Sequence, residues 1–121
     1  MLIVFDSLTG NVDRFVGKLS LPSQRITKGL VVKTDYILIT YTTGLGKVPE
    51  TTAGFLKDNS AYLRGVASSG NRNFGSNFAR AADEIAEKYK VPLLLKFEFF
   101  GVPSDITRLM EEINHELYRT E

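Results

Sequence analysis

The chain has 121 residues, a formal net charge of +1 at neutral pH and no cysteine. This length suits one domain and is too short for two, so we expect a single domain over residues 1–121. Without cysteine, disulfides, thiolate metal sites and cysteine nucleophiles are excluded, and the small charge argues against nucleic acid or a membrane surface as a partner. The first residues, MLIVFDSLTG, predict neither a signal peptide nor a membrane span, and hence a cytoplasmic protein.

Short apolar runs predict five strands. The runs at 2–5 and 36–40 are continuous, as is typical of strands covered on both faces. Weaker strand patterns occur at 24–26, which we expect near a sheet edge, at 63–67 and at 93–99.

Between these runs, apolar residues recur at the helical spacing of three and four and predict four helices. Pro22 should end the first helix, and Pro49 and Glu50 suit the first turn of the second. The expected inner faces are Val12, Phe15, Val16 and Leu19, then Val48, Thr52, Phe55 and Leu56, then Phe78, Ala81, Ala82, Ile85 and Tyr89, and finally Ile106, Leu109, Met110, Ile113 and Leu117.

This alternation of strands and helices predicts an α/β fold with a parallel sheet, because each crossover is long enough to carry a helix. For this length we expect a flavodoxin-like sheet of five strands in the order 2-1-3-4-5, with helices on both faces. Ligands of such sheets bind outside the carboxyl ends of the strands, where the strand order reverses. The loops after the first, third and fourth strands are therefore the candidate site.

The first of these loops reads Ser7-Leu8-Thr9-Gly10-Asn11 and leads directly into a helix. The N–H groups of a helix start and two hydroxyls can bind a phosphate. No lysine follows the glycine and no GxGxxG pattern is present, so a terminal monophosphate fits better than a triphosphate or a dinucleotide. The same residues are also typical of an ordinary turn and helix cap, and this loop alone does not choose between the two.

The second loop reads Thr40-Tyr41-Thr42-Thr43-Gly44-Leu45-Gly46. Its glycines would let the backbone approach a flat ligand, and Tyr41 could lie against an aromatic ring system. Considered alone, this loop favours the alternative of a simple connection with Tyr41 packed.

The third loop reads Ser68-Ser69-Gly70-Asn71-Arg72-Asn73-Phe74-Gly75 and is longer than a strand-to-helix turn needs. The amides of Asn71 and Asn73 suit the edge of a planar heterocycle, and Phe74 offers a second stacking face. A mobile surface loop is the alternative, and Arg72 could pair with a cofactor or with an acidic partner. Because all three loops should meet at one edge of the sheet, together they favour a mononucleotide-like cofactor.

These segments also carry a family resemblance. Residues 7–11 resemble the phosphate loop of flavodoxins, and residues 9–15, 39–49 and 65–75 resemble the NrdI family, the flavodoxin-like accessory proteins of class Ib ribonucleotide reductase. The similarity covers nearly the whole chain. It implies a flavin mononucleotide (FMN) protein without catalytic residues or metal ligands of its own. The cofactor-binding residues it implies are Ser7, Leu8, Thr9, Gly10, Asn11, Val12, Thr40, Tyr41, Thr42, Thr43, Gly44, Leu45, Gly46, Ser68, Ser69, Gly70, Asn71, Asn73, Phe74 and Gly75.

The resemblance further implies a redox accessory protein rather than a stand-alone enzyme. Its reduced flavin would react with dioxygen and supply superoxide or a related oxidant to the small, radical-bearing subunit of the reductase, where a dimanganese-tyrosyl radical cofactor is assembled. A flavin or ferredoxin-type reductase would donate the electrons.

Three departures and three rival functions accompany this expectation. Val12 stands where flavodoxins often have a second threonine, Phe74 stands where relatives commonly have tryptophan, and the near-neutral charge differs from that of the strongly acidic flavodoxins. A general flavodoxin electron carrier and a cofactor-free interaction module remain alternatives. A response-regulator receiver domain would need an acidic cluster after the first strand, and only Asp6 is present there. We expect His115, the single histidine, to lie away from the site.

Overall fold

The computed structural model describes the backbone of residues 1–119 and the side chains of residues 1–116. Its strands form one parallel sheet in the order β2-β1-β3-β4-β5. The strands are β1 (Leu2–Phe5), β2 (Ser23–Arg25), β3 (Tyr36–Tyr41), β4 (Leu63–Gly70) and β5 (Leu93–Glu98). The predicted fold class and strand order are confirmed, including the position of β2 at the edge.

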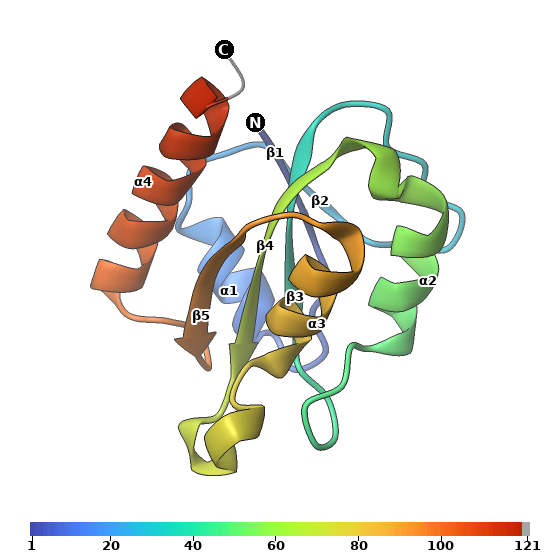
Figure 1. Ribbon diagram of the computed structural model, residues 1–121. Helices are drawn as coiled ribbons and strands as arrows, with labels where there is room; N and C mark the ends of the chain where they lie inside the picture. Colours follow the sequence, from blue (N-terminus) through green and yellow to red (C-terminus); the bar gives the residue numbers. More distant parts are fainter. Residues whose placement is uncertain (120–121) are drawn as a thin grey trace.

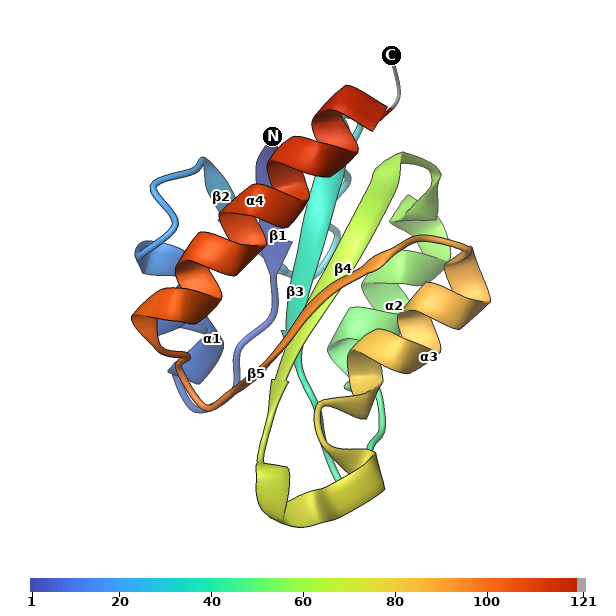
Figure 2. The same ribbon diagram turned by 60° about the vertical axis from the view of Figure 1, so that its left-hand side comes forward.

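Helices cover both faces of this sheet. They are α1 (Asn11–Gly17), α2 (Glu50–Asn59), α3 (Arg80–Tyr89) and α4 (Pro103–Arg119), with short 3₁₀ helices at Ser60–Tyr62 and Arg72–Asn77. α1 and α4 lie on one face, and α2 and α3 lie on the other (Figures 1 and 2). Among the described residues, no helix is both long and apolar enough to cross a bilayer.

The pleat of β3 supplies both halves of the core. Ile37 and Ile39 pack in the cluster beneath α1 and α4, whereas Tyr36 and Leu38 pack in the cluster beneath α2 and α3. All four side chains are fully buried. Because successive side chains of a strand point to opposite faces, a continuous apolar run serves two cores at once. Burial of each such side chain stabilises the fold by about 1.5–3 kcal/mol.

The helical stripes also form as expected, with small shifts at their ends. Val12, Phe15 and Val16 are the buried residues of α1, but this helix ends at Gly17, so Leu19 is buried just beyond it and Pro22 lies further on. In α4, the expected residues up to Ile113 pack in the core, and the Leu117 side chain lies outside the described residues.

The prediction that a loop begins at Ser68 is wrong, because β4 continues to Gly70 and pairs with both neighbours. The hydroxyl of Ser68 is buried, donates a hydrogen bond to the carbonyl oxygen of Ala79 (2.7 Å) and accepts one from the N–H of Ala82 (3.1 Å). A polar residue is therefore satisfied inside a central strand by the start of α3. Phe78 precedes this helix rather than lying on its stripe.

Candidate functional site

A cavity of about 290 Å³ opens at the carboxyl edge of the sheet, between the ends of β1, β3, β4 and β5 and the segments that follow them. We call it the carboxyl-edge cavity. Its lining consists of Ser7, Leu8, Thr9, Asn11, Val12, Tyr41, Thr42, Thr43, Gly44, Ser69, Gly70, Asn71, Phe74, Asn77, Ala79 and Phe99. β1 has β2 on one side and β3 on the other, so the cavity lies at the point where the strand order reverses.

The loop after β1 is fixed from two sides. Gly10 immediately precedes α1 with a φ of +89°, a conformation that favours glycine. The hydroxyl of Ser7 accepts a hydrogen bond from the N–H of Asp13 (3.3 Å), and the Ser7 carbonyl oxygen accepts one from the guanidinium of Arg25 (3.3 Å). Arg25 also pairs with Asp13 at 3.1 Å. This arginine, on the edge strand β2, thus holds the loop in place, although no local pattern in the sequence indicates that contact.

The segment after β3 forms a small hairpin, which we call the 43–47 hairpin. Thr43 and Lys47 exchange two backbone hydrogen bonds of 2.9 and 2.8 Å. Gly44 and Gly46 have φ values of +54° and +92°, and Leu45 at the tip is 73% exposed. In Figure 1 the hairpin extends below the sheet. Only Thr43 and Gly44 of the hairpin line the cavity.

The end of β4 can hold its shape only with glycine at position 70. A Cβ atom built on Gly70 would lie 2.5 Å from the backbone nitrogen of Ala79. Asn71 follows, and its side-chain oxygen accepts a hydrogen bond from the N–H of Asn73 (2.9 Å). Arg72 does not line the cavity, and its guanidinium lies 3.9 Å from the Glu98 carboxylate and over the Phe78 ring. Arg72 is therefore used within the chain.

Seven residues that the sequence predicted for the site do not line the cavity, namely Gly10, Thr40, Leu45, Gly46, Ser68, Asn73 and Gly75. Thr40 and Ser68 are fully buried and paired with each other across β3 and β4. Their side chains point toward α2 and α3, because they alternate with Tyr41 and Ser69, which line the cavity. Conversely, sequence reasoning missed Asn77, Ala79 and Phe99.

A buried carboxylate connects the segments beneath the cavity. Asp6, directly after β1, is 8% exposed, and its carboxylate accepts hydrogen bonds from the hydroxyls of Thr51 and Thr52, the latter at 2.7 Å. The Thr52 hydroxyl also lies 2.8 Å from that of Thr40. The positive end of the α2 dipole favours a carboxylate at this place. The ends of β1 and β3 are thus joined through the first turn of α2.

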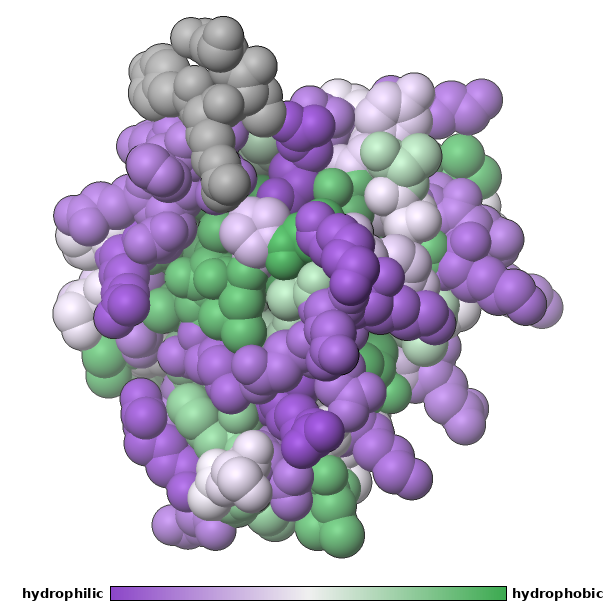
Figure 3. All heavy atoms as spheres, viewed as in Figure 1, coloured by the Kyte–Doolittle hydropathy of each residue, from purple (hydrophilic) through white to green (hydrophobic). Residues whose placement is uncertain are grey.

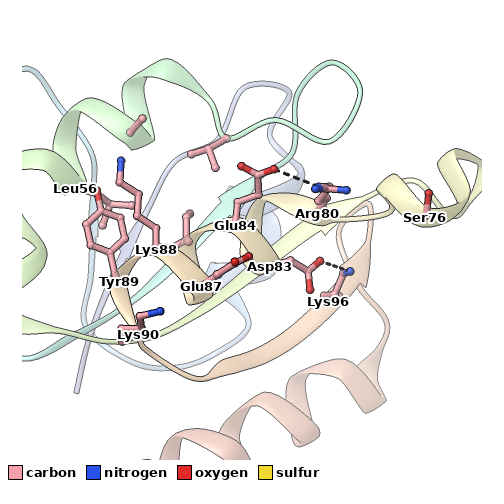
Figure 4. A pocket seen from close by; sticks show the side chains of 13 residues that line it. Leu56, Ser76, Arg80, Asp83, Glu84, Glu87, Lys88, Tyr89, Lys90 and Lys96 are labelled. Atoms are coloured by element: carbon pink, nitrogen blue, oxygen red, sulfur yellow. Dashed lines mark hydrogen bonds and ion pairs between the residues drawn. The ribbon is translucent and has the colours of Figure 1, made fainter.

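A larger groove of about 910 Å³ runs along α2 and α3 and reaches Val48 and Ser76, next to the second and third loops (Figure 4). Leu56 and Ile85 are among its apolar residues, and most of the others are charged. Ion pairs join Arg80 to Glu84 (3.2 Å) and Lys96 to Asp83 (2.6 Å), as Figure 4 shows. Because charges of both signs neutralise one another here, volume alone does not make the groove a ligand site. Among the residues described, no cluster of acidic or histidine side chains could hold a metal ion.

A parallel sheet of this order with a cavity at its switch point defines a flavodoxin-like protein. A solved structure titled as a short-chain flavodoxin associated with a non-canonical PDU bacterial microcompartment superimposes with a TM-score of 0.76. The match covers 99% of this chain and 97% of that one at 18% sequence identity. At such low identity the similarity establishes the fold alone.

Sequence comparison is more specific. The family model described as NrdI Flavodoxin like matches residues 3–111. Protein NrdI of Bacillus licheniformis is 47% identical over 112 residues, covering 92% of this chain and 86% of the relative. The SPbeta prophage-derived protein NrdI of Bacillus subtilis is 40% identical over 115 residues, covering 92% and 89%. The chain belongs to the NrdI flavodoxin-like family, which confirms the resemblance and implies a flavin cofactor.

Proposed function

We propose that this chain binds FMN in the carboxyl-edge cavity and, when reduced, supplies the oxidant that assembles the dimanganese-tyrosyl radical cofactor of a class Ib ribonucleotide reductase small subunit. One observation carries the proposal: a hydroxyl-rich loop, a glycine hairpin and a strand end that tolerates only glycine converge on one cavity in a chain of the NrdI family. A flavin or ferredoxin-type reductase would supply the electrons.

The cavity fits a flavin mononucleotide in its chemistry. At one end, Ser7, Thr9 and Asn11 offer two hydroxyls and an amide beside the start of α1, which suits a phosphate. The lining also includes three aromatic rings, those of Tyr41, Phe74 and Phe99, which suit the faces and edges of a tricyclic ring. Polar phosphate-binding groups and ring-packing groups thus occur in the same cavity.

The chain would tune the cofactor rather than perform the chemistry itself. Held in the carboxyl-edge cavity and reduced, FMN would supply the one-electron reduction of dioxygen to superoxide, or the formation of a related oxidant. We propose that the backbone of residues 44–46 reorients on reduction, so that a carbonyl oxygen accepts a hydrogen bond from the protonated ring nitrogen N5. Gly44 and Gly46 allow this change at low cost, because both already have positive φ values. Identical hairpins in oxidised and reduced crystals would contradict this step.

The mouth of the cavity also suits docking of a protein partner. Leu8 is 73% exposed and Phe74 is 51% exposed, and both line the cavity. Figure 3 shows apolar groups at the lower edge of the molecule, where the strands end, and a larger apolar area higher up, beside α4. Leu8 and Phe74 offer apolar contact area to a partner at the rim of the cavity. A partner seated here would receive the oxidant beside its source.

Reconstitution distinguishes the proposed role from that of a general electron carrier. The FMN-loaded, reduced protein is mixed with a manganese-loaded small subunit and dioxygen, and the tyrosyl radical is measured by electron paramagnetic resonance. The proposal predicts radical formation that requires the reduced protein and is blocked by superoxide-scavenging enzymes only before the complex forms. If the protein merely passes electrons to acceptors and yields no radical, the general carrier role is correct instead.

A further inference from the structure

Backbone strain occurs at the carboxyl-edge cavity. Four non-glycine residues of the described chain have positive φ values, namely Ser20, Ala79, Lys90 and Phe99. Lys90 caps the end of α3, and Ser20 is an exposed residue shortly after α1, both ordinary places for such a conformation. Ala79 and Phe99 both line the cavity. For a bulky residue such as phenylalanine this conformation is a genuine outlier.

The positive φ of Phe99 lies at the point where β5 ends. Phe97, two residues earlier in β5, is fully buried and stacks on Phe15 with the ring centres 3.9 Å apart. If β5 continued, Phe99 would point to the same face of the sheet as Phe97. β5 ends at Glu98, however, and Phe99, with a φ of +52°, is 47% exposed and lines the cavity, whereas Phe97 is buried in the core.

The turn at 98–101 is held firmly on both sides. The N–H of Phe99 donates to the carbonyl oxygen of Gly70 (3.1 Å), and the N–H of Gly101 donates to that of Glu98 (2.9 Å). A Cβ atom on Gly101 would lie 2.6 Å from the Phe15 ring. Such strain persists only where the surroundings enforce it, and it is typical of functional sites.

We propose that this strained turn places the ring of Phe99 against the flavin, so that Phe99 is a cofactor-packing residue on the β5 side of the site. The inference rests on the proposed FMN site and adds to it a residue outside the three loops that the sequence indicated. Gly70 links the turn at 98–101 to the residue before α3. Its carbonyl oxygen accepts the hydrogen bond from the Phe99 N–H, while its Cα packs against the backbone of Ala79.

The test compares Phe99→Gly, Phe99→Ala and Phe99→Tyr. FMN affinity is measured by quenching of flavin fluorescence, the bound flavin by its absorption bands, and stability by urea unfolding of the apoprotein. We expect Phe99→Gly and Phe99→Ala to raise the Kd about tenfold and to shift the bands, because the ring contact is lost. Phe99→Tyr should keep the Kd within about twofold and restore the bands.

The stability of the apoprotein variants distinguishes backbone strain at position 99 from the loss of the ring contact with FMN. Phe99→Gly should have an unfolding equilibrium constant about five- to tenfold smaller than that of Phe99→Ala, because only glycine adopts this backbone freely. The matched control pair, Ser20→Gly and Ser20→Ala, should differ in the same direction without changing FMN binding. If Phe99→Ala fails to fold, Phe99→Gly still carries the binding test.

The outcomes are distinguishable. A wild-type chain that binds no FMN overturns the proposed site and this inference with it. A wild-type chain that binds FMN while Phe99→Gly binds within twofold, with unchanged bands, leaves the site standing and overturns the role of Phe99. Equal stability of the glycine and alanine variants at 99 would show that the turn is not strained.

Discussion

The two ends of the sheet use their polar groups differently. At the amino end of β3, the buried Tyr36 hydroxyl donates to the carbonyl oxygen of Asn59 (2.7 Å), and the Asn59 side chain makes three further hydrogen bonds to the backbone. At the carboxyl end, hydroxyls and amides line an open cavity together with two non-glycine residues that have positive φ. At the amino end the polar groups are buried and hydrogen-bonded within the chain. At the carboxyl end, polar groups and a strained backbone line a cavity that a ligand can enter. Stability and function are thus separated along the strands.

The largest expected effect is at the carboxyl end. Gly70→Ala places a methyl group against the backbone of Ala79, which cannot yield as a flexible side chain would. We expect a loss of about 3 kcal/mol or more of stability, typical of a strained or overpacked site, and no measurable FMN binding. Gly54→Ala is the control, because a Cβ atom there meets nothing within 4 Å. It should stabilise α2 by about 0.5–1 kcal/mol and leave FMN binding intact. Urea unfolding and flavin titration measure both.

The next effect is at the amino end. Asn59→Ala removes the side-chain partners of Val32, Leu30 and Phe55 and should cost about 2–3 kcal/mol in urea unfolding, because it leaves buried backbone groups unpaired. The affinity of the folded protein for FMN should not change. If Asn59→Ala also weakened FMN binding by the folded protein, the two ends of the sheet would be coupled. That result would contradict the separation of stability and function along the strands.

Asp6→Asn tests the connection beneath the cavity. The amide keeps one acceptor but replaces the charged oxygen that receives two hydroxyl hydrogen bonds, so we expect a loss of about 1–2 kcal/mol. FMN affinity should fall severalfold, because the ends of β1 and β3 are no longer held together. Thr51→Ser, which keeps the hydroxyl, is the control and should behave like the wild type in both measurements.

The smallest effect appears only at high pH. Burial raises the pKa of Tyr36 well above its ordinary value of 10.0, with a smaller contribution from Tyr89. Above pH 10 the unfolded chain therefore releases a proton that the folded chain keeps, so the free energy of unfolding should fall by up to about 1.4 kcal/mol per pH unit. In Tyr36→Phe this part of the slope should be absent, although the variant is less stable at neutral pH. Equal slopes in both proteins would contradict a buried, protonated Tyr36.

Patterns local in the sequence predicted most of the fold. Continuous apolar runs such as 36–40 identify strands buried on both faces, and the crossovers between them leave few possible orders. The polar end of β4 was not predictable in this way, because Ser68 is satisfied by Ala79 and Ala82, which approach it only in the folded structure.

The site likewise has parts that local sequence patterns predict and parts that depend on contacts formed only in the folded structure. The loops after β1, β3 and β4 carry glycines and hydroxyls in a pattern that indicated a cavity before the fold was known. Phe99 has no such signal, because it continues the alternation of Lys96, Phe97 and Glu98 as a strand residue would. Only the hydrogen bond to Gly70 and the packing of Gly101 on Phe15 reveal the turn.

The central claim is a flavin in the carboxyl-edge cavity, and stoichiometric titration of the apoprotein with FMN, followed by stepwise anaerobic reduction in the visible spectrum, tests it most directly. We predict a yellow complex with one FMN per chain, whose absorption bands differ from those of free FMN and bleach on reduction. A protein that stays colourless, or leaves the spectrum of free FMN unchanged at every ratio, would contradict the account.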